Sequence, residues 1–476
     1  MPLAHADPVL EVPMKSRVPG SIHPSMQPIA RVIAHGAPGL STALPLALPM
    51  VLITALFMLG ACGGDSGPLT FHKDVKPIVD ARCAGCHYEG GIAPFALTSF
   101  EDFEVHSGIS MAAIEAGTMP PWQANNECND YIGDRSLGDE DIQVLEDWME
   151  AGSLEGDPAN PGEPLVVERT ELSRVDLELT MAEPYTPVTR SDYSDDYRCF
   201  LLEWPETETT YVTGFRAVPG ADAVVHHVIA FLATPDQVGG YPGLDDADPG
   251  PGYECFGATG GPAQTWLGSW APGNLGNDLP AGVGLEVEPG SLIVLQVHYN
   301  TLAVPAGAAI PADQTKIQMS LESSVERVGS MMPWANPLWL TGQNMRIPAN
   351  DSDVSHTFGL DPNLFQGSQR LEIHGAGLHM HLLGKSASLE VVHANGERSC
   401  VLQVDEYDFD WQDGYALRQP IEVLRGDVLK LECHWDNTAG NQPVVDGEPQ
   451  LPRDVFWGEG STDEMCLGVL LVVPDP

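Results

Sequence analysis

The chain has 476 residues, of which 43% are hydrophobic, so it is long enough for two or three domains with real cores. Its 67 acidic residues against 22 basic ones give a formal net charge of −45, which argues against nucleic acid as a partner because phosphate binding needs a cationic surface. The 49 glycines and 41 prolines favour many short strands joined by turns.

The N-terminal segment, residues 1–61, has the features of an export signal. An uncharged apolar run, LPLALPMVLITALFMLGAC, ends at Cys62 and follows several basic residues. It resembles a bacterial lipoprotein signal, in which the cysteine becomes the lipidated first residue; the alternative is a simple membrane anchor with an unmodified cysteine. Either interpretation predicts an exported protein, here an outer-membrane or periplasm-facing lipoprotein, and Met26 is an alternative start.

Residues 62–151 are predicted to form a small all-α domain that carries haem. The run Cys83-Ala-Gly-Cys86-His87 is typical of covalent c-type haem attachment, in which two thioethers hold the ring and the histidine binds the iron. A zinc site would need a second cysteine pair, and a dithiol redox pair would need a thioredoxin-like βαβ pattern around it. Neither pattern is present, so the motif predicts a c-type cytochrome.

Met119 is the predicted sixth ligand of the haem iron. It precedes two prolines, which favours a rigid loop, whereas Met149 lies in a predicted helix, DEDIQVLEDWME, with its apolar residues on one side. Met111 is the other competitor. Ligation by His and Met leaves no open iron position, so the domain is predicted to carry electrons and not to activate oxygen.

The helix that contains Met149 is predicted to have Asp139 as its N-cap and to stop at Gly152. After it, residues 152–169 are rich in Gly, Pro and acidic residues and have no periodicity, which predicts a linker.

From about residue 170 the pattern changes to short apolar alternations bounded by Gly, Pro, Asn and Asp, which predicts strands. Two antiparallel β-sandwich domains are expected, over residues 170–322 and 323–476. The segments read as strands are TYVTGFRAV, AVVHHVIAFL, SLIVLQVHYNT, QRLEIHGAGLHMHLLG, SASLEVVHA, DVLKLECHW and CLGVLLVV.

The histidines that are candidate metal ligands lie on three of these predicted strands. His379 and His381 leave the same face of a strand, because side chains alternate, and form a metal site that lacks a third ligand. His226 and His227 are adjacent, so joint ligation of one ion requires a bulge or a twist at that point. His298, taken alone, is more often a core residue than a ligand.

Two further residues lie near these histidines in sequence. His374, five residues before His379, is expected on the opposite face of the strand, where it is either packed or hydrogen-bonded to a ligand. Gln296 shares the face of His298, and a local hydrogen-bonding role is expected for it.

Four segments in order, VHH, LQVHYN, HMHLLGKS and TDEMCLGVLLV, resemble the copper type II ascorbate-dependent monooxygenases over roughly residues 180–476. The resemblance implies two tandem jelly-roll-like sandwiches, each holding one copper across an open, water-filled cleft. It implies that one copper, which stores and passes an electron, is bound by His226, His227 and His298. It implies that the other, where O2 is activated, is bound by His379, His381 and Met465; a thioether ligand independently favours copper.

The resemblance also implies a disulfide between Cys433 and Cys466, next to Met465. Apart from Cys62 and the haem-binding pair, six cysteines remain, which is consistent with up to three disulfides in an oxidising compartment. The sequence does not pair the other four, Cys128, Cys199, Cys255 and Cys400, although Cys199–Cys255 is one candidate.

The sequence departs from the peptide-processing members of this family at two positions. Gly377 and Val469 stand where those members carry an Arg and a Tyr that hold the carboxylate of a peptide. Gly375 and Leu378 add to a roomier and more apolar pocket. Since the negative charge of the chain repels anions, a small uncharged or cationic organic substrate is expected.

The sequence therefore predicts a copper-dependent monooxygenase that hydroxylates a C–H bond with O2 and uses two copper ions and one haem c. Electrons are expected from an external donor, an ascorbate-like reductant or a redox protein, through the fused haem domain. The alternative is a non-catalytic copper- and haem-binding surface lipoprotein for electron relay or copper handling. A β-sandwich adhesin would leave the four ordered motifs unexplained.

Overall fold

The computed structural model describes residues 67–475, apart from the gaps at 169, 189–194, 256–257, 264, 302–303, 306, 341–343, 410, 446–447 and 459–461. The predicted export signal and Cys62 lie outside the described residues. Within the described ranges, no helix has both the length and the apolar character needed to cross a membrane.

Helices form the first described part of the chain, as the sequence predicts. They are η1 (Phe71–Val75, a π-helical turn), α1 (Lys76–Arg82), α2 (Phe100–Glu115) and α3 (Asp139–Glu150). Leu145 and Trp148, three residues apart on α3, bury one helix face in a core formed with residues of the other helices. The cap of α3 differs from the prediction: Gly138 is the N-cap and Asp139 begins the helix, which ends at Glu150.

The segment that follows α3, predicted as a linker, is held against the helices. The Leu154 carbonyl accepts from the Phe71 backbone N–H at 2.8 Å and from the Trp148 indole N–H at 2.9 Å. The Gly162 N–H donates to the His72 carbonyl at 3.0 Å. These bonds place an irregular but ordered strap across the helical part.

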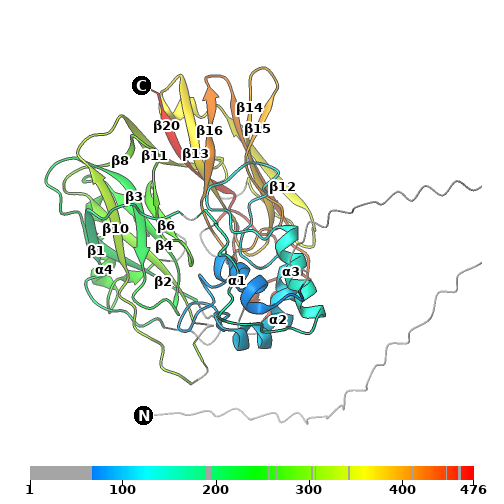
Figure 1. Ribbon diagram of the computed structural model, residues 1–476. Coiled ribbons are helices and arrows are strands. Elements are labelled where there is room, and N and C mark those ends of the chain that lie inside the picture. Colours follow the sequence, from blue (N-terminus) through cyan, green and yellow to red (C-terminus); the bar gives the residue numbers. More distant parts are fainter. Residues whose placement is uncertain are drawn as a thin grey trace, which may run out of the picture. The chain divides into compact units, whose positions relative to one another are not determined.

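Strands make up most of the rest, in the order predicted from the apolar alternations (Figure 1). One sheet has the order β5 (Tyr253–Glu254), β2 (Asp195–Glu203), β9 (Leu292–Asn300), β4 (Val225–Ala233) and β6 (Thr265–Trp270). A second has the order β12 (Val354–Leu360), β17 (Val428–Trp435), β14 (Gly384–Val392) and β15 (Arg398–Val404). Short elements in the loops are η2 (Val238–Gly240), α4 (Pro242–Ala247), α5 (Asn363–Gln366), β18 (Val444–Val445) and β19 (Glu448–Pro449).

The third and longest sheet runs through both halves of the β-rich region. Its order is β1 (Leu177–Thr180), β10 (Lys316–Glu322), β3 (Thr210–Val218), β8 (Val283–Val287), β11 (Arg327–Trp334), β20 (Leu467–Pro474), β13 (Arg370–His379) and β16 (Tyr415–Leu424), with β7 (Asn277–Asp278) also on β3. The join is a parallel pairing of β11 with β8, while β11 pairs antiparallel with β20. The expectation of two antiparallel sandwich domains is therefore corrected at the join. β11 belongs to the second predicted domain, but it pairs in parallel with β8 of the first and antiparallel with β20 of the second.

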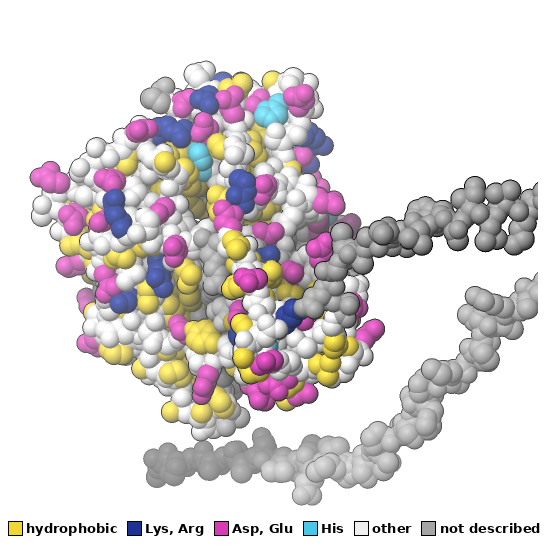
Figure 2. Space-filling model, viewed as in Figure 1, with side chains coloured by type: hydrophobic (Ala, Val, Ile, Leu, Met, Phe, Trp, Pro, Cys, Tyr) yellow, Lys and Arg dark blue, Asp and Glu magenta, His cyan; other side chains and the backbone are white. Residues whose placement is uncertain are grey.

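On the face shown in Figure 2, Lys and Arg side chains are scattered among Asp and Glu side chains. Among the described residues, Arg174 forms ion pairs with Asp176 and Glu322. Acidic residues outnumber basic ones over the whole chain, which gives the net charge of −45.

Three disulfides are present within the described residues, the number that the cysteine count allows. Cys433–Cys466 is the pair implied by the resemblance, and Cys199–Cys255 is the candidate named from sequence; both are confirmed. Cys128–Cys400 was not predicted. It joins the segment after α2 to β15 across a sequence separation of 272 residues.

The segment around Cys128 packs on the second half of the β-rich region. The Asn125 N–H donates to the Gln403 carbonyl at 2.8 Å, and the Ile132 N–H donates to the Ala416 carbonyl at 2.9 Å. Tyr131 is buried in the same hydrophobic core as the strands of that half. The helical part is therefore fastened to the β-rich part by backbone bonds, a buried aromatic and a disulfide.

The double substitution Cys128→Ser, Cys400→Ser is expected to lower the free energy of unfolding by about 2–5 kcal/mol, because it frees a long loop of the unfolded chain. It is also expected to expose the segment around Cys128 to proteases. Urea unfolding and limited proteolysis measure the two effects. The matched pair Cys199→Ser, Cys255→Ser, which closes a span of 56 residues elsewhere, should leave that segment protected. Equal cleavage in both variants would contradict the anchoring role.

Candidate metal centres

His226, His227 and His298 come together on two neighbouring strands, β4 and β9. The pairing of these strands shifts register between Val225 and His227, so His226 is an extra residue in the ladder. This bulge lets two consecutive side chains turn to the same side, which a regular strand forbids. The Nδ1 atom of His298 lies 3.1 Å from Nδ1 of His226 and 3.2 Å from Nδ1 of His227. Three imidazole nitrogens thus converge on one point.

Burial determines the protonation state of this histidine cluster. His227 and His298 are buried, and burial lowers the pKa of each well below its usual range. Both rings are therefore neutral, the form of histidine that binds metals. Tyr197 stacks on His298 with 4.1 Å between ring centroids, which fixes the plane of that ring. Gln296 donates to the Cys255 carbonyl at 2.9 Å, the local role expected for it.

His379 and His381 form a second pair. His379 is the last residue of β13 and His381 follows in the turn, so the two do not lie on one strand as predicted. Their ring centroids are still 5.0 Å apart. Gln412 fixes the tautomer of His379: its amide nitrogen donates to the Phe409 carbonyl, so its oxygen faces Nδ1 of His379 at 2.6 Å. His379 must donate from Nδ1, which leaves Nε2 for a metal.

Met465 lies two residues before β20, the last strand. The final pair of the β13–β20 ladder is His379 with Leu467. The two residues before Met465 contact His381: the Glu464 carboxylate accepts from its N–H, and the Asp463 carbonyl lies 3.3 Å from its Nδ1. Met465 is 5% exposed, and its neighbour Cys466 is bonded to Cys433 on β17. The disulfide therefore ties the segment that carries the thioether to the strand beside it.

Glu464 is a residue near the candidate ligands that sequence reasoning missed. Its carboxylate is fully buried and accepts from the His381 N–H at 2.9 Å, the Leu383 N–H at 2.7 Å and the Trp435 indole N–H at 2.8 Å. Burial raises the pKa of Glu464 to about 7. In the sequence it reads as part of a polar flank, and nothing in the local pattern signals that it holds the turn of His381.

The two groups of histidines face each other through the loop 405–414, between β15 and β16. The Trp411 ring lies 5.8 Å from that of His226, and the Phe409 ring lies 5.9 Å from that of His381. A cavity of only about 10 Å³ is bounded by His226, His227, Trp411 and Gln412. Charge on His379 also contributes to lowering the pKa of His227, after burial and the nearer histidines. At this point, side chains of the loop therefore lie between the two histidine groups.

A larger cavity of about 270 Å³ extends from His379 between the two halves of the long sheet. Most of its wall is apolar and comes from both halves; it includes Phe215, Trp266, Leu267, Met331, Leu378, Val469 and Leu471. Gly375 and Gly377 line it with backbone. The roomy, apolar pocket predicted around these glycines is therefore present.

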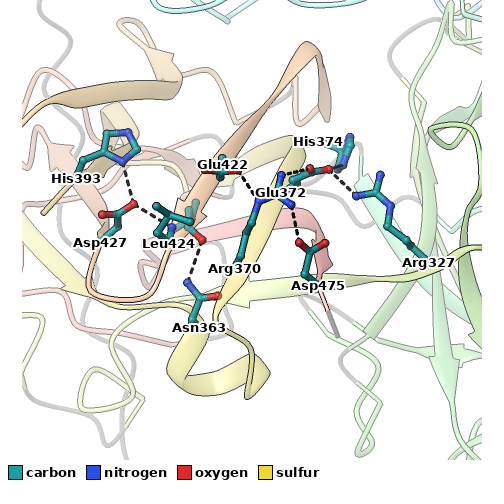
Figure 3. Close-up of polar contacts among 11 residues, drawn as sticks. Arg327, Asn363, Arg370, Glu372, His374, His393, Glu422, Leu424, Asp427 and Asp475 are labelled. Carbon is teal, nitrogen blue, oxygen red and sulfur yellow. Dashed lines mark hydrogen bonds and ion pairs between the residues drawn. The ribbon is translucent and has the colours of Figure 1, made fainter.

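His374 lies in a second bulge, between Ile373 and Gly375, and it lines the same cavity as His379. The expectation that it faces the opposite side is corrected, because the bulge breaks the alternation on which it rested. Its Nε2 lies 3.1 Å from Glu372, whose carboxylate also accepts from Arg327 at 2.7 Å (Figure 3). His374 therefore belongs to a carboxylate network that joins β11 to β13.

Glu372 should make stability depend on pH. The hydrogen bond from Arg327 holds the pKa of this carboxyl below its ordinary value of 4.5. Its contribution, about 1 kcal/mol, is therefore complete above pH 4.5 and is lost as the pH falls below that value. Glu372→Gln should unfold at a lower urea concentration than the wild type at pH 7. Its free energy of unfolding should also fall less steeply than that of the wild type between pH 5 and 3. Urea unfolding at each pH measures both effects. Exposed Glu406→Gln controls for net charge. A slope as steep as that of the wild type would contradict the role.

The predicted haem-binding residues lie at one end of the helical part. Cys83 and Cys86 are thiols outside the disulfides, and His87 donates from Nδ1 to the Phe95 carbonyl at 3.0 Å, which leaves Nε2 available. Met111 is buried in the helical core and Met149 packs against that core, whereas Met119 is part of neither set. Cys86 also lines the 270 Å³ cavity that contains His379.

Comparisons with known proteins cover the β-rich region. The model for the N-terminal domain of copper type II ascorbate-dependent monooxygenases matches residues 180–304, and the model for the C-terminal domain matches residues 339–472. Together these matches span more than half of the chain. Residues 67–179, which include η1, α1, α2 and α3, lie outside both.

Several curated proteins are similar to the chain. Human DBH-like monooxygenase protein 1 is 24% identical over 72% of this chain and 56% of its own length. Tyramine beta-hydroxylase of Caenorhabditis briggsae is 20% identical over 63% of this chain and 49% of its own length. Human dopamine beta-hydroxylase is 23% identical over 58% of this chain and 43% of its own length. The chain thus spans about half the length of these relatives. A solved structure of PNGF-II, 10% identical over 63% of this chain and 65% of its own, has a TM-score of 0.24, too low to bear on function.

The two domain matches lie in chain order, and each contains one of the two histidine groups described above. The three disulfides, which form in oxidising compartments, indicate an exported or secreted protein. The chain belongs to the copper type II ascorbate-dependent monooxygenase family.

Proposed function

We propose that the chain is a copper-dependent monooxygenase that hydroxylates a C–H bond of an uncharged or cationic organic substrate with O2. The observation that carries the proposal is the convergence of three Nδ1 atoms, from His226, His227 and His298, in a buried site of a chain of this family. Neutral imidazoles arranged in this way suit copper.

The second copper site consists of His379, His381 and Met465. Gln412 leaves Nε2 of His379 free for the metal, and Glu464 holds the turn that carries His381. Copper bound at the two sites would supply one-electron redox chemistry and a place for O2 to bind. For each turnover, one oxygen atom enters the product and the other leaves as water, which consumes two electrons and two protons from the donor.

The 270 Å³ cavity is the substrate site in this proposal, since His379 lies in its wall. Its apolar lining binds a hydrophobic body and keeps water from the reacting C–H bond. Arg135, which also lines it, is paired with Asp413 and is not free to hold an anion. With Gly377 and Val469 in place of charged or hydroxyl groups, the pocket favours substrates without a carboxylate.

The helical part would supply the electrons. Cys83 and Cys86 fit thioether attachment of haem c, His87 presents Nε2 to the iron, and Met119 is the proposed sixth ligand. Cys86 opens on the substrate cavity, and a Cβ added at Gly273 would lie 3.4 Å from its sulfur, so the proposed attachment site adjoins the copper-binding half. A lipid at Cys62 would anchor the protein to a membrane, with an ascorbate-like reductant or a redox protein as external donor.

Metal analysis of the full chain should give two coppers and one haem, and ascorbate should drive O2 uptake that depends on an apolar amine or neutral aromatic substrate. Mass spectrometry with ¹⁸O2 should place one labelled atom in the product. His298→Ala is the matched control and should lose one copper and the uptake. Two coppers and one haem without incorporation of label from any compound would overturn the monooxygenase and favour the alternative of a copper- and haem-binding electron relay.

A further inference from the structure

We propose that Trp411 and Gln412 are positioning residues that hold the two copper centres against each other and bridge the path of the electron between them. The inference rests on the proposed function, because it requires copper at both sites. It concerns the loop 405–414 of the second half, which none of the four sequence motifs includes.

The loop contacts candidate ligands of both centres. Trp411 lies beside the ring of His226, a ligand of the first centre, with 5.8 Å between centroids. The next residue, Gln412, is hydrogen-bonded to His379, a ligand of the second centre, at 2.6 Å. One peptide bond therefore separates a ring in contact with the first centre from an amide bonded to the second.

Little room remains for another path between the centres at this place. The cavity bounded by His226, His227, Trp411 and Gln412 measures about 10 Å³, which is about one probe sphere of the size of water. The side chains of Trp411 and Gln412 thus bound this small space beside His226 and His227.

Residues from the segment after α2 hold the loop from its other side. The Gln123 side chain donates to the carbonyls of Asp408 at 2.8 Å and Trp411 at 2.6 Å, and it accepts from the Asp408 N–H at 3.1 Å. Arg135 forms an ion pair with Asp413, which directly follows Gln412. Cys128 lies between Gln123 and Arg135 in the sequence, and its disulfide with Cys400 fixes their segment to β15. The loop is therefore clamped in place.

The step that the bridge serves transfers one electron and no atom. The electron leaves the site of His226, His227 and His298, which is oxidised by one electron. It arrives at the site of His379, His381 and Met465, which is reduced by one electron. The ascorbate-like donor later restores the first site.

Dipolar electron paramagnetic resonance of the full chain loaded with two Cu(II) ions tests the inference without turnover. The wild type should show a strong dipolar coupling between the two Cu(II) ions, with a narrow distribution of the distance between them. Gln412→Leu with Trp411→Ala should weaken and broaden it, because the centres lose their common brace. Gln412→Leu alone should weaken copper binding at the second site roughly 10- to 100-fold, and Gln412→Glu, which keeps an acceptor for His379, should restore it. Gln123→Leu, which touches no ligand, should broaden the distribution to a smaller extent.

Reoxidation kinetics supply a second measurement on the same samples. After full reduction and mixing with O2, freeze-quenched wild type should regain both Cu(II) signals together. In the double variant, the Cu(II) signal of one site should return about 100-fold more slowly than that of the other site. A displacement of about 1 Å is enough for an effect of this size. Gln318→Leu, on β10 and bonded to Glu178 outside the loop 405–414, is the control and should behave as wild type.

The outcomes separate the two claims. A wild-type chain that holds fewer than two coppers would overturn the proposed function, and this inference with it. Two coppers retained in the double variant, with the coupling and the joint reoxidation unchanged, would overturn the inference alone.

Discussion

Met465→His is expected to keep copper bound at the second site but to lower O2-dependent turnover by roughly 100-fold or more. A thioether stabilises Cu(I), whereas a third imidazole holds the metal in a set suited equally to Cu(II) or zinc, so the site loses its redox preference. Copper content per chain, and O2 uptake with ascorbate as reductant, measure the two effects.

Met380→Leu is the matched control, since Met380 lies between His379 and His381 in the sequence but is fully buried in the hydrophobic core. This volume-conserving exchange should cost less than about 1.5 kcal/mol of stability and leave turnover intact. If Met465→His retained full turnover, the thioether would have no part in the reaction and the second site would be a binding site only.

Glu464→Leu is expected to destabilise the protein by about 3 kcal/mol or more. The substitution leaves three buried donors, on His381, Leu383 and Trp435, without the carboxylate that accepts from them, and each costs about 1–3 kcal/mol. The turn that carries His381 should also relax, which should weaken copper binding at the second site. Urea unfolding of the copper-free chain and copper titration measure these effects separately.

Glu464→Gln serves as the graded comparison. Its single amide oxygen can still accept from the two donors that share one carboxylate oxygen, His381 and Trp435, while its NH2 group faces the Leu383 N–H. The loss of stability should therefore be smaller than that of Glu464→Leu. Equal unfolding midpoints for wild type and Glu464→Leu would mean that these hydrogen bonds do not support the turn.

The periodic parts of the chain could be predicted from sequence. The strand segments around His226, His298 and His379 appear where apolar alternation places them, and the helix of Trp148 appears where its 3.6-residue pattern places it. The need for a bulge at His226 also followed from sequence, because two adjacent side chains cannot otherwise meet one ion. Local geometry determined each of these outcomes.

The features that sequence did not predict depend on long-range contacts. Trp411 and Gln412 lie in a loop without periodicity. Gln412 is 33 residues from its partner His379. Trp411 contacts His226, which belongs to the other half of the β-rich region. The Cys128–Cys400 pairing could not be chosen among the remaining cysteines, since nothing local links positions 272 residues apart. The end of β13 at His379 and the bulge at His374 depend on pairing with β20, which a single strand pattern does not encode.

The parallel pairing of β11 with β8 has a consequence for how this protein can be divided. A cut between residues 322 and 327 would leave Val283–Leu285 on one fragment and Arg327–Gly329 on the other as bare sheet edges. Exposed edges of that kind recruit other chains into aggregates. Recombinant fragments designed at this boundary should therefore precipitate, whereas co-expressed fragments should recombine through the same edge and stay in solution.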